Sequence, residues 1–185
     1  MQKKILMILG VASLLCTSGC KTKQAETEDT AQIKSYIEGA TAAKLETEYD
    51  SLQNSDGFAV ITKDQLLSSI GDGEVNAIIY MGYPGCENCQ NAIASIQSAA
   101  IATEQTVYSL DVSEEIETDE DYDEIYNALE SILVSLDKDN PDAIELYTPH
   151  VFAIVSGELR QGYVGYTEGY DYMPIVSFSE YTNVK

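Results

Sequence analysis

The spacing of apolar and polar positions changes repeatedly between residues 58 and 112, and each change predicts an element. Three largely apolar runs have the length of buried strands: FAVI (58–61), NAIIYMGY (76–83) and TVYSLDV (106–112). Residues 62–71 and 90–102, which lie between them, carry apolar residues at helical spacing. Strands that alternate with helices are typical of an α/β domain in which helices pack against a sheet.

The second half of the chain contains the pattern of a hairpin. Residues 150–155 (HVFAIV) and 159–166 (LRQGYVGY) alternate like strands, and the turn residues SGE lie between them. The end of the chain is rich in tyrosine, contains Pro174 and has no clear helical pattern. We find no repeat and no second domain, so residues 56–185 are expected to form one α/β domain.

An acidic segment separates the third predicted strand from this hairpin. Residues 113–124 (SEEIETDEDYDE) precede a helical pattern, where negative charge favours the helix N-terminus. The alternative is a Ca²⁺ site at residues 137–142 (DKDNPD), which lack the central glycine and closing glutamate of an EF-hand loop. The region of about 113–140 is expected to be an acidic helical insertion. Five apolar residues are predicted to share one face of its helix: Ile125, Leu129, Ile132, Leu133 and Leu136.

The first residues have the pattern of an export signal. Two lysines precede the apolar run ILMILGVASLLC, and two small residues precede Cys20. An ordinary buried helix would be amphipathic, whereas this run is apolar on all sides. The order resembles a bacterial lipoprotein signal in which Cys20 is lipidated, although Thr17 stands where that family usually has leucine. Cleavage without a lipid is the alternative.

These features divide the chain into three parts. Residues 1–19 are expected to be the signal peptide, and residues 20–55 are expected to be a lipid-anchored polar tether because their apolar residues are sparse. Residues 56–185 follow as the domain. The mature protein is therefore expected outside the cytoplasm, anchored to the cell membrane through Cys20.

The charge of the chain limits its partners. Removal of residues 1–19 would leave 8 basic and 31 acidic residues, a net charge of −23. Nucleic acid is excluded as a partner because phosphates require lysine and arginine, and anionic lipid head groups would be repelled. The charge keeps the protein soluble or attracts a cationic partner. We expect a monomer.

The cysteines concentrate in one motif. Cys16 lies within the predicted signal and Cys20 at the predicted lipid site, so Cys86 and Cys89 remain for chemistry. An exported scaffold stapled by disulfides would have cysteines spread along the chain. The two remaining cysteines instead form a C-x-x-C pair between a buried strand and a helix.

A C-x-x-C pair at a helix start suits disulfide exchange. Residues three apart share one helix face, which brings the two sulfurs within bonding range. The free N–H groups and the dipole favour the thiolate of Cys86, and thiolate is the attacking species. Cys89 lies one turn further in and suits the resolving role. Cys86 is predicted to attack a substrate disulfide and Cys89 to displace the product; the reverse sequence would oxidise a substrate.

Two stretches carry a resemblance to a known family. They are YMGYPGCENC (80–89) and TPHVFAIVSGELRQGYVGY (148–166). Through these two stretches the region 58–166 resembles the thioredoxin superfamily. The first stretch is similar to the thioredoxin-like proteins known as bacteriocin transport accessory proteins. The resemblance implies a thioredoxin-like fold, with a central mixed sheet flanked by helices, and a cis peptide bond before Pro149, close to the cysteines. It also implies that Thr148 offers backbone groups to the substrate chain.

The chain departs from the thioredoxin pattern in several places. Gly85 stands where thioredoxins have tryptophan, and Tyr80 replaces a buried acid to which a proton-handling role is usually assigned. The loop between the third strand and Thr148 is longer, and the usual C-terminal helix is not evident.

Two residues are expected to tune the redox potential. Glu87 places negative charge beside Cys86, which raises a thiol pKa and favours a reducing pair. We predict a reduction potential for the Cys86–Cys89 pair that is closer to that of a reducing pair, roughly −270 mV, than to that of a strong oxidase, roughly −120 mV. His150 has two interpretations: a protonated imidazole near Cys86 would favour the thiolate, or the ring faces away and is solvated or hydrogen-bonded.

Three functions fit these residues. The first is an extracytoplasmic thiol–disulfide oxidoreductase that acts on the thiols and disulfides of exported proteins and needs no cofactor. The second is a non-catalytic accessory or binding module in which the disulfide is structural, with a link to bacteriocin export that only the resemblance implies. The third is a metal site formed by Cys86, Cys89 and His150, which lacks a fourth ligand and a second C-x-x-C.

Overall fold

The computed structural model of the chain describes residues 36–136 and 138–177, which fall within the unit Ala31–Lys185. The predicted signal peptide (1–19), the lipidation site Cys20 and the first part of the tether lie outside the described residues. Asp137, which would begin the alternative Ca²⁺ loop, also lies outside them.

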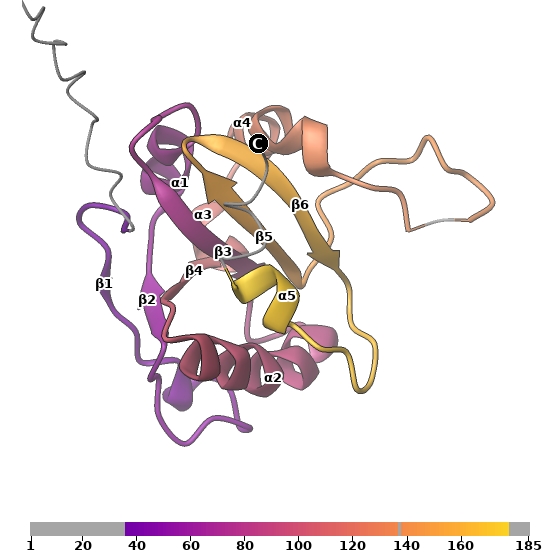
Figure 1. Cartoon of the computed structure of the whole chain (residues 1–185). Coiled ribbons are helices and arrows are strands. Elements are labelled where there is room, and N and C mark those ends of the chain that lie inside the picture. Colours follow the sequence, from indigo (N-terminus) through magenta and orange to yellow (C-terminus); the bar gives the residue numbers. More distant parts are fainter. Residues whose placement is uncertain (1–35, 137, 178–185) are drawn as a thin grey trace, which may run out of the picture. The chain divides into compact units, whose positions relative to one another are not determined.

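A mixed sheet of six strands forms the centre of the fold (Figure 1), in the order β1-β2-β4-β3-β5-β6. The strands β2, β4 and β3 run parallel, whereas β1, β5 and β6 pair antiparallel with their neighbours. The α/β class with a mixed sheet, predicted from the sequence, is confirmed. The strands are β1 (Thr41–Ala42), β2 (Phe58–Val60), β3 (Asn76–Gly82), β4 (Val107–Asp111), β5 (His150–Val155) and β6 (Glu158–Val164).

Helices cover both faces of this sheet (Figure 1). The helix over one face, α2, follows β3 directly, and α1 begins with the predicted cap, in which Thr62 accepts from the Gln65 backbone N–H and Gln65 closes the capping box. A short helix, α5, occupies part of the end of the chain where no helix was expected. The helices are α1 (Lys63–Ser69), α2 (Glu87–Thr103), α3 (Val112–Glu115), α4 (Asp119–Leu129) and α5 (Met173–Val176), with 3₁₀ turns η1 (Leu45–Thr47) and η2 (Glu130–Ile132).

The side chains of β3 alternate between two hydrophobic layers. Ile78 and Tyr80 pack with α2 and α5, and Ile79 and Met81 pack with α1 and α4 on the other face. All four are fully buried. A strand that is buried on both faces reads as a continuous apolar run, which is why β3 was recognisable in the sequence.

The expected tether is corrected for residues 36–55, which pack into the domain. Their buried side chains are spaced irregularly, so no helical or strand period marked them. Two glutamine amides of α2 hold this segment: Gln90 donates to the Glu48 carbonyl (3.1 Å), and Gln97 donates to the Asn54 carbonyl (2.9 Å). The segment places four apolar side chains in the core: Ile37, Leu45, Tyr49 and Leu52.

The acidic segment forms two helices and a 3₁₀ turn where one longer helix was predicted. Thr118 caps α4 in a capping box with Asp121. Ile125 and Leu129 are buried as expected, but Leu136 lies beyond the helical turns and is 47% exposed. Lys63 of α1 donates to the carboxylates of Asp121 and Glu124, and its hydrogen bond lowers the pKa of Asp121 to about 2. The insertion is therefore attached to the body of the domain.

The predicted hairpin is confirmed as β5 and β6, with an irregularity in register between Val151 and Ala153. Gly162 of β6 lies at this point against the β5 backbone. A Cβ atom at Gly162 would overlap the Val151 carbonyl and lie 2.7 Å from the Cα atom of Phe152. Only a residue without a side chain allows the two strands to approach this closely.

We expect Gly162→Ala to lower the free energy of unfolding by about 2 kcal/mol, because the methyl group meets backbone that cannot move aside. Gly73→Ala is the matched control, since a Cβ atom there meets nothing within 4 Å. Urea unfolding of the two variants tests this. Equal midpoints would show that the hairpin adjusts at no cost.

Candidate functional site

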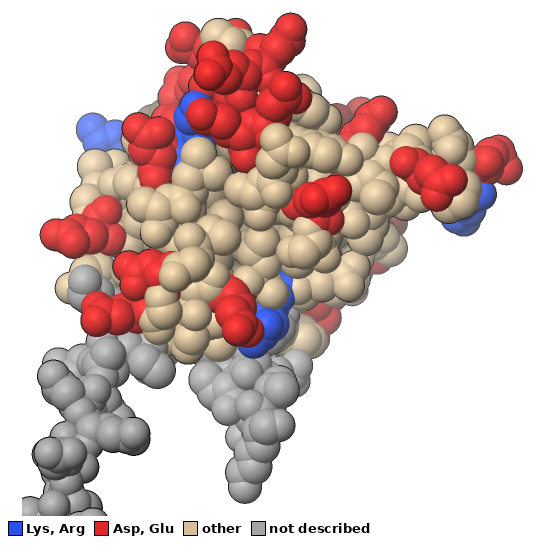
Figure 2. Space-filling view, turned by 90° about the horizontal axis from the view of Figure 1, so that it is seen from above, with Lys and Arg blue, Asp and Glu red and all other residues tan. Residues whose placement is uncertain are grey.

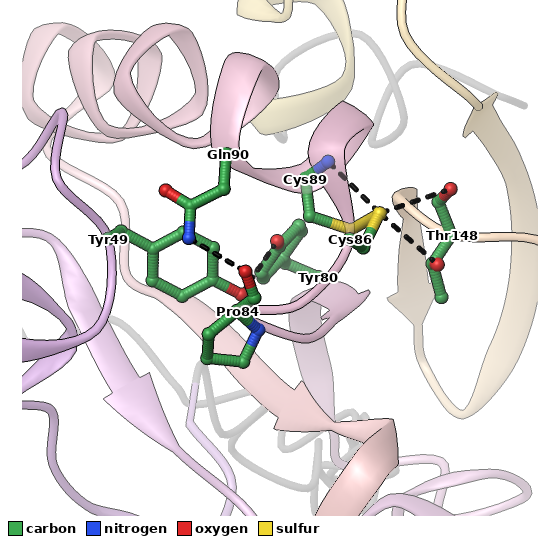
Figure 3. The surroundings of a disulfide bond; sticks show 7 residues. All are labelled: Tyr49, Tyr80, Pro84, Cys86, Cys89, Gln90 and Thr148. Carbon is green, nitrogen blue, oxygen red and sulfur yellow. Dashed lines mark hydrogen bonds between the residues drawn. A yellow bond between two sulfur atoms is a disulfide. The ribbon is translucent and has the colours of Figure 1, made fainter.

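Cys86 and Cys89 are joined in a disulfide at the start of α2 (Figure 3). Their Cα atoms are 5.1 Å apart, as expected for positions i and i+3 on one helical turn. The turn after β3 places Cys86 at this position. In this turn the Cys86 N–H donates to the Tyr83 carbonyl (3.1 Å). Cys86 is partly exposed, whereas Cys89 is completely buried. Only Cys86 is thus open to attack from outside.

Cys86 is also the N-cap of α2. Its Sγ atom accepts a hydrogen bond from the Cys89 N–H at 3.1 Å, as the first turn of a helix requires of its cap. The same N–H and the positive end of the helix dipole would stabilise a thiolate on Cys86. The position therefore favours the ionised form of the sulfur that faces solvent.

Thr148 and Pro149 lie beside this sulfur. The bond between them is cis, as the resemblance implied. The Thr148 hydroxyl donates to Cys86 Sγ at 3.6 Å, and the Thr148 carbonyl oxygen lies 3.8 Å from the same atom. The topology explains the contact, because β5 runs antiparallel to β3 and pairs His150 with Met81, just before the cysteine turn.

Gln90 anchors the cysteine turn from the other side. Its amide donates to the Pro84 carbonyl at 2.8 Å (Figure 3) and to the Glu48 carbonyl at 3.1 Å. One side chain therefore joins the turn before Cys86 to the N-terminal segment. Sequence reasoning missed this residue, because a glutamine in a helix carries no specific signal.

Two tyrosines form a buried polar pair next to the disulfide. The hydroxyls of Tyr49 and Tyr80 are 3.1 Å apart, and both side chains are buried. Burial, followed by the neighbouring Tyr49, raises the pKa of Tyr80 well above its usual value. Tyr80 was noted in the sequence, but Tyr49 lies in the segment expected to be a tether and was missed.

His150 does not lie where the tuning hypothesis needs it. It shares its side of β5 with Phe152, whose ring is 5.0 Å away, and Phe152 belongs to the layer opposite α2 and Cys89. Burial lowers the pKa of His150 to about 4, so the ring is neutral near pH 7. Within the described part of the chain, neither ring nitrogen has a hydrogen-bond partner. The geometry therefore does not support a protonated His150 beside the thiolate. The ring faces away from Cys86, as the alternative expected, but it is buried and without a hydrogen-bond partner among the described residues, rather than solvated or hydrogen-bonded.

Acidic residues surround the cysteine edge of the sheet. Glu87, the first residue of α2, is exposed beside Cys86, and Asp111 ends β4 opposite Gly82. Burial, followed by Asp111 and Glu114, raises the pKa of Glu48. Figure 2 shows several separate clusters of acidic side chains on one face of the molecule and few basic ones. The effect of Glu87 on the redox potential remains a prediction.

Residues 36–136 and 138–177 contain no group of three or more His, Cys, Asp or Glu side chains able to hold a metal ion. The alternative site of Cys86, Cys89 and His150 does not assemble, because His150 lies on the other face of the sheet. Across the same residues, no helix is both long and apolar enough to cross a membrane.

No protein-family model matches this chain, and no curated protein matches it. Its chemistry is therefore indicated by its own residues. The cysteine motif and Thr148 come together from two distant parts of the sequence, in an arrangement that leaves one sulfur accessible and one protected.

Proposed function

We propose that this chain is a thiol–disulfide oxidoreductase with a thioredoxin-like fold, in which Cys86 is the attacking residue and Cys89 the resolving residue. One observation carries the proposal: the Cys86–Cys89 disulfide caps a helix, with Cys86 partly exposed beside Thr148 and Cys89 buried. A disulfide that served only as a staple would need neither an accessible sulfur nor a neighbouring backbone edge.

The reaction follows from the two sulfurs. In the reduced protein, the Cys86 thiolate attacks a substrate disulfide and releases one substrate sulfur as a thiolate. Cys89 then loses its proton and attacks Cys86 Sγ, which forms the intramolecular disulfide and releases the second substrate sulfur. The substrate gains two electrons and the protein loses two. In reverse, the same steps oxidise a substrate dithiol.

Thr148 supplies the substrate edge in this proposal. Its carbonyl lies 3.8 Å from Cys86 Sγ and precedes β5, so an extended substrate segment has a backbone partner beside the sulfur. Pairing through backbone atoms tolerates many side chains. The proposed substrates are therefore the thiols and disulfides of exported proteins as a class. In this proposal the chain acts on them outside the cytoplasm, where it is anchored through Cys20.

A non-catalytic binding module is the second candidate, and the tyrosines near the C-terminal end favour it. The rings of Tyr163 and Tyr170 stack with centroids 3.6 Å apart and remain partly exposed. Exposed aromatic rings are common at protein interfaces. In that case the disulfide would only stiffen the structure.

Trapping separates the two candidates. Cys89→Ala cannot resolve a mixed disulfide, so it should accumulate a covalent adduct with a disulfide-linked peptide through Cys86, visible by mass spectrometry and removed by dithiothreitol. The matched control is the double variant Cys86→Ala/Cys89→Ala, which should form no adduct at these positions. A reduced Cys89→Ala protein that forms no adduct over hours would contradict the proposal and support the binding module.

A further inference from the structure

A pair of buried phenol hydroxyls lies on the side of the disulfide that faces the protein interior. Tyr80 comes from β3 and Tyr49 from the N-terminal segment, and their oxygens are 3.1 Å apart. The exposed fractions of the two side chains are 0% and 2%. Burying two hydroxyls is costly unless they are hydrogen-bonded, and here each is the partner of the other in one hydrogen bond, which uses the proton of only one of them.

The Tyr80 hydroxyl and Cys89 Sγ border the same small space above Gly82. A Cβ atom at Gly82 would overlap the Tyr80 hydroxyl and lie 3.1 Å from Cys89 Sγ. Because Gly82 has no side chain, the phenol oxygen and the sulfur can both lie close to the backbone at this position. Figure 3 shows the Tyr80 ring beside the two cysteines, with Tyr49 beyond it.

Disulfide cleavage creates a difficulty at the buried sulfur. When an external thiolate attacks Cys86 Sγ, a new S–S bond forms, the Cys86–Cys89 bond breaks, and its electron pair remains on Cys89 Sγ. Cys89 is completely buried, and a buried thiolate is unfavourable unless a donor faces it. The Cys89 N–H already points at Cys86 Sγ.

We propose that the Tyr80 hydroxyl donates a hydrogen bond to Cys89 Sγ while that sulfur carries the negative charge, and that Tyr49 is a positioning residue that holds the phenol in place. This inference rests on the proposed function. No proton leaves Tyr80 in the step: the electron pair passes from the broken S–S bond to Cys89, and the phenol stays neutral.

The ionisation of the pair suits a donor. Burial is the main cause that raises the pKa of Tyr80 well above its usual value and the pKa of Tyr49 to about 12. Both phenols therefore keep their protons throughout the pH range in which thiols exchange. When Tyr49 donates to Tyr80, the proton of Tyr80 is free to point at the sulfur.

The test uses the full-length oxidised protein and dithiothreitol as the attacking thiol, with the Cys86–Cys89 pair followed by alkylation and mass spectrometry. In Tyr80→Phe we expect reduction to slow by about tenfold, since a hydrogen bond to a charged group is worth at least that factor. In the reduced protein, we expect the pKa of the Cys89 thiol, measured by ¹³C NMR of labelled cysteine, to rise by about one. A merely structural role of Tyr80 would not change that pKa.

Tyr108→Phe is the matched control. It removes the hydroxyl of a buried tyrosine that lies on the opposite face of the same sheet, and it should leave both values unchanged. An unchanged rate and an unchanged Cys89 pKa in Tyr80→Phe would overturn the proposal. If Tyr80→Phe does not fold, Tyr49→Phe decides: we expect about a threefold slower reduction, and the wild-type rate would overturn the proposal.

This measurement is independent of the protein substrate. Dithiothreitol reports on the sulfur pair alone, so a protein that fails to exchange with peptides would contradict the proposed function and leave the effect of Tyr80 measurable. Normal peptide exchange with no effect in Tyr80→Phe would contradict only the inference about Tyr80.

Discussion

Cys86→Ser is expected to slow disulfide exchange with a fluorescent disulfide-linked peptide by roughly a thousandfold or more. The serine hydroxyl is hardly ionised near neutral pH, so the helix N-terminus has no anion to stabilise and no nucleophile faces solvent. Cys89 cannot take over, because its side chain is completely buried. The measurement is the rate of peptide cleavage by the pre-reduced protein under single-turnover conditions.

Cys89→Ser is the matched control for this loss. It keeps the accessible sulfur, so it should react once with the peptide at close to the wild-type rate and then stop as a mixed disulfide. Equal rates in the wild-type protein and both variants would show that the measured cleavage does not pass through this pair. The two serine variants differ by one helical turn, which makes the comparison a direct test of the assigned roles.

The stability of the domain is expected to fall between pH 7 and pH 4 through His150. The pKa of this histidine is about 4 in the folded protein and 6.5 in an unfolded chain, because burial disfavours its charged form. The unfolded chain therefore binds more protons as the pH drops through this window, and the folded state loses stability. The loss from this one group should be about 2 kcal/mol at pH 5 and about 3 kcal/mol at pH 4.

His150→Leu isolates the contribution of the histidine. Both proteins share the same carboxylates, so the difference between their unfolding free energies, measured by urea from pH 7.5 to pH 5, removes every other titration. Because the sequence pI is about 4.1, measurement should stop above it. Parallel curves for the two proteins would mean that His150 reaches solvent in the folded state.

The sequence was most informative where one period dominates. The strands β3, β4 and β5 and the helix α2 were recognisable, because an apolar run or a helical spacing marked each of them. The cysteine motif and Thr148 were also found, although their proximity depended on a resemblance and on pairing between β3 and β5. Gly85, Tyr80 and the long acidic loop were seen as departures, but their structural consequences were not.

The errors have physical causes. Tyr49 was missed because residues 36–55 bury single side chains in an irregular chain path, which has no period to detect. The side of the sheet occupied by His150 depends on which strand face meets α2, and alternation alone does not specify that face. The acidic helix was predicted too long because Leu133, which ends the 3₁₀ turn in an extended conformation, is still buried in the hydrophobic layer of α1 and α4. Its apolar side chain therefore extended the apparent helical stripe.

The packing of residues 36–55 has a consequence for how far the domain would reach from a lipid anchor at Cys20. A tether from Cys20 to residue 56 would span at most about 120 Å when fully extended. A tether from Cys20 to residue 36 would span at most about 55 Å. With the anchor that we propose, the accessible sulfur of Cys86 would therefore stay within a shorter distance of the bilayer than a tether of residues 20–55 would allow. Substrates within that distance would be polypeptides that are still emerging from the membrane or are themselves attached to it.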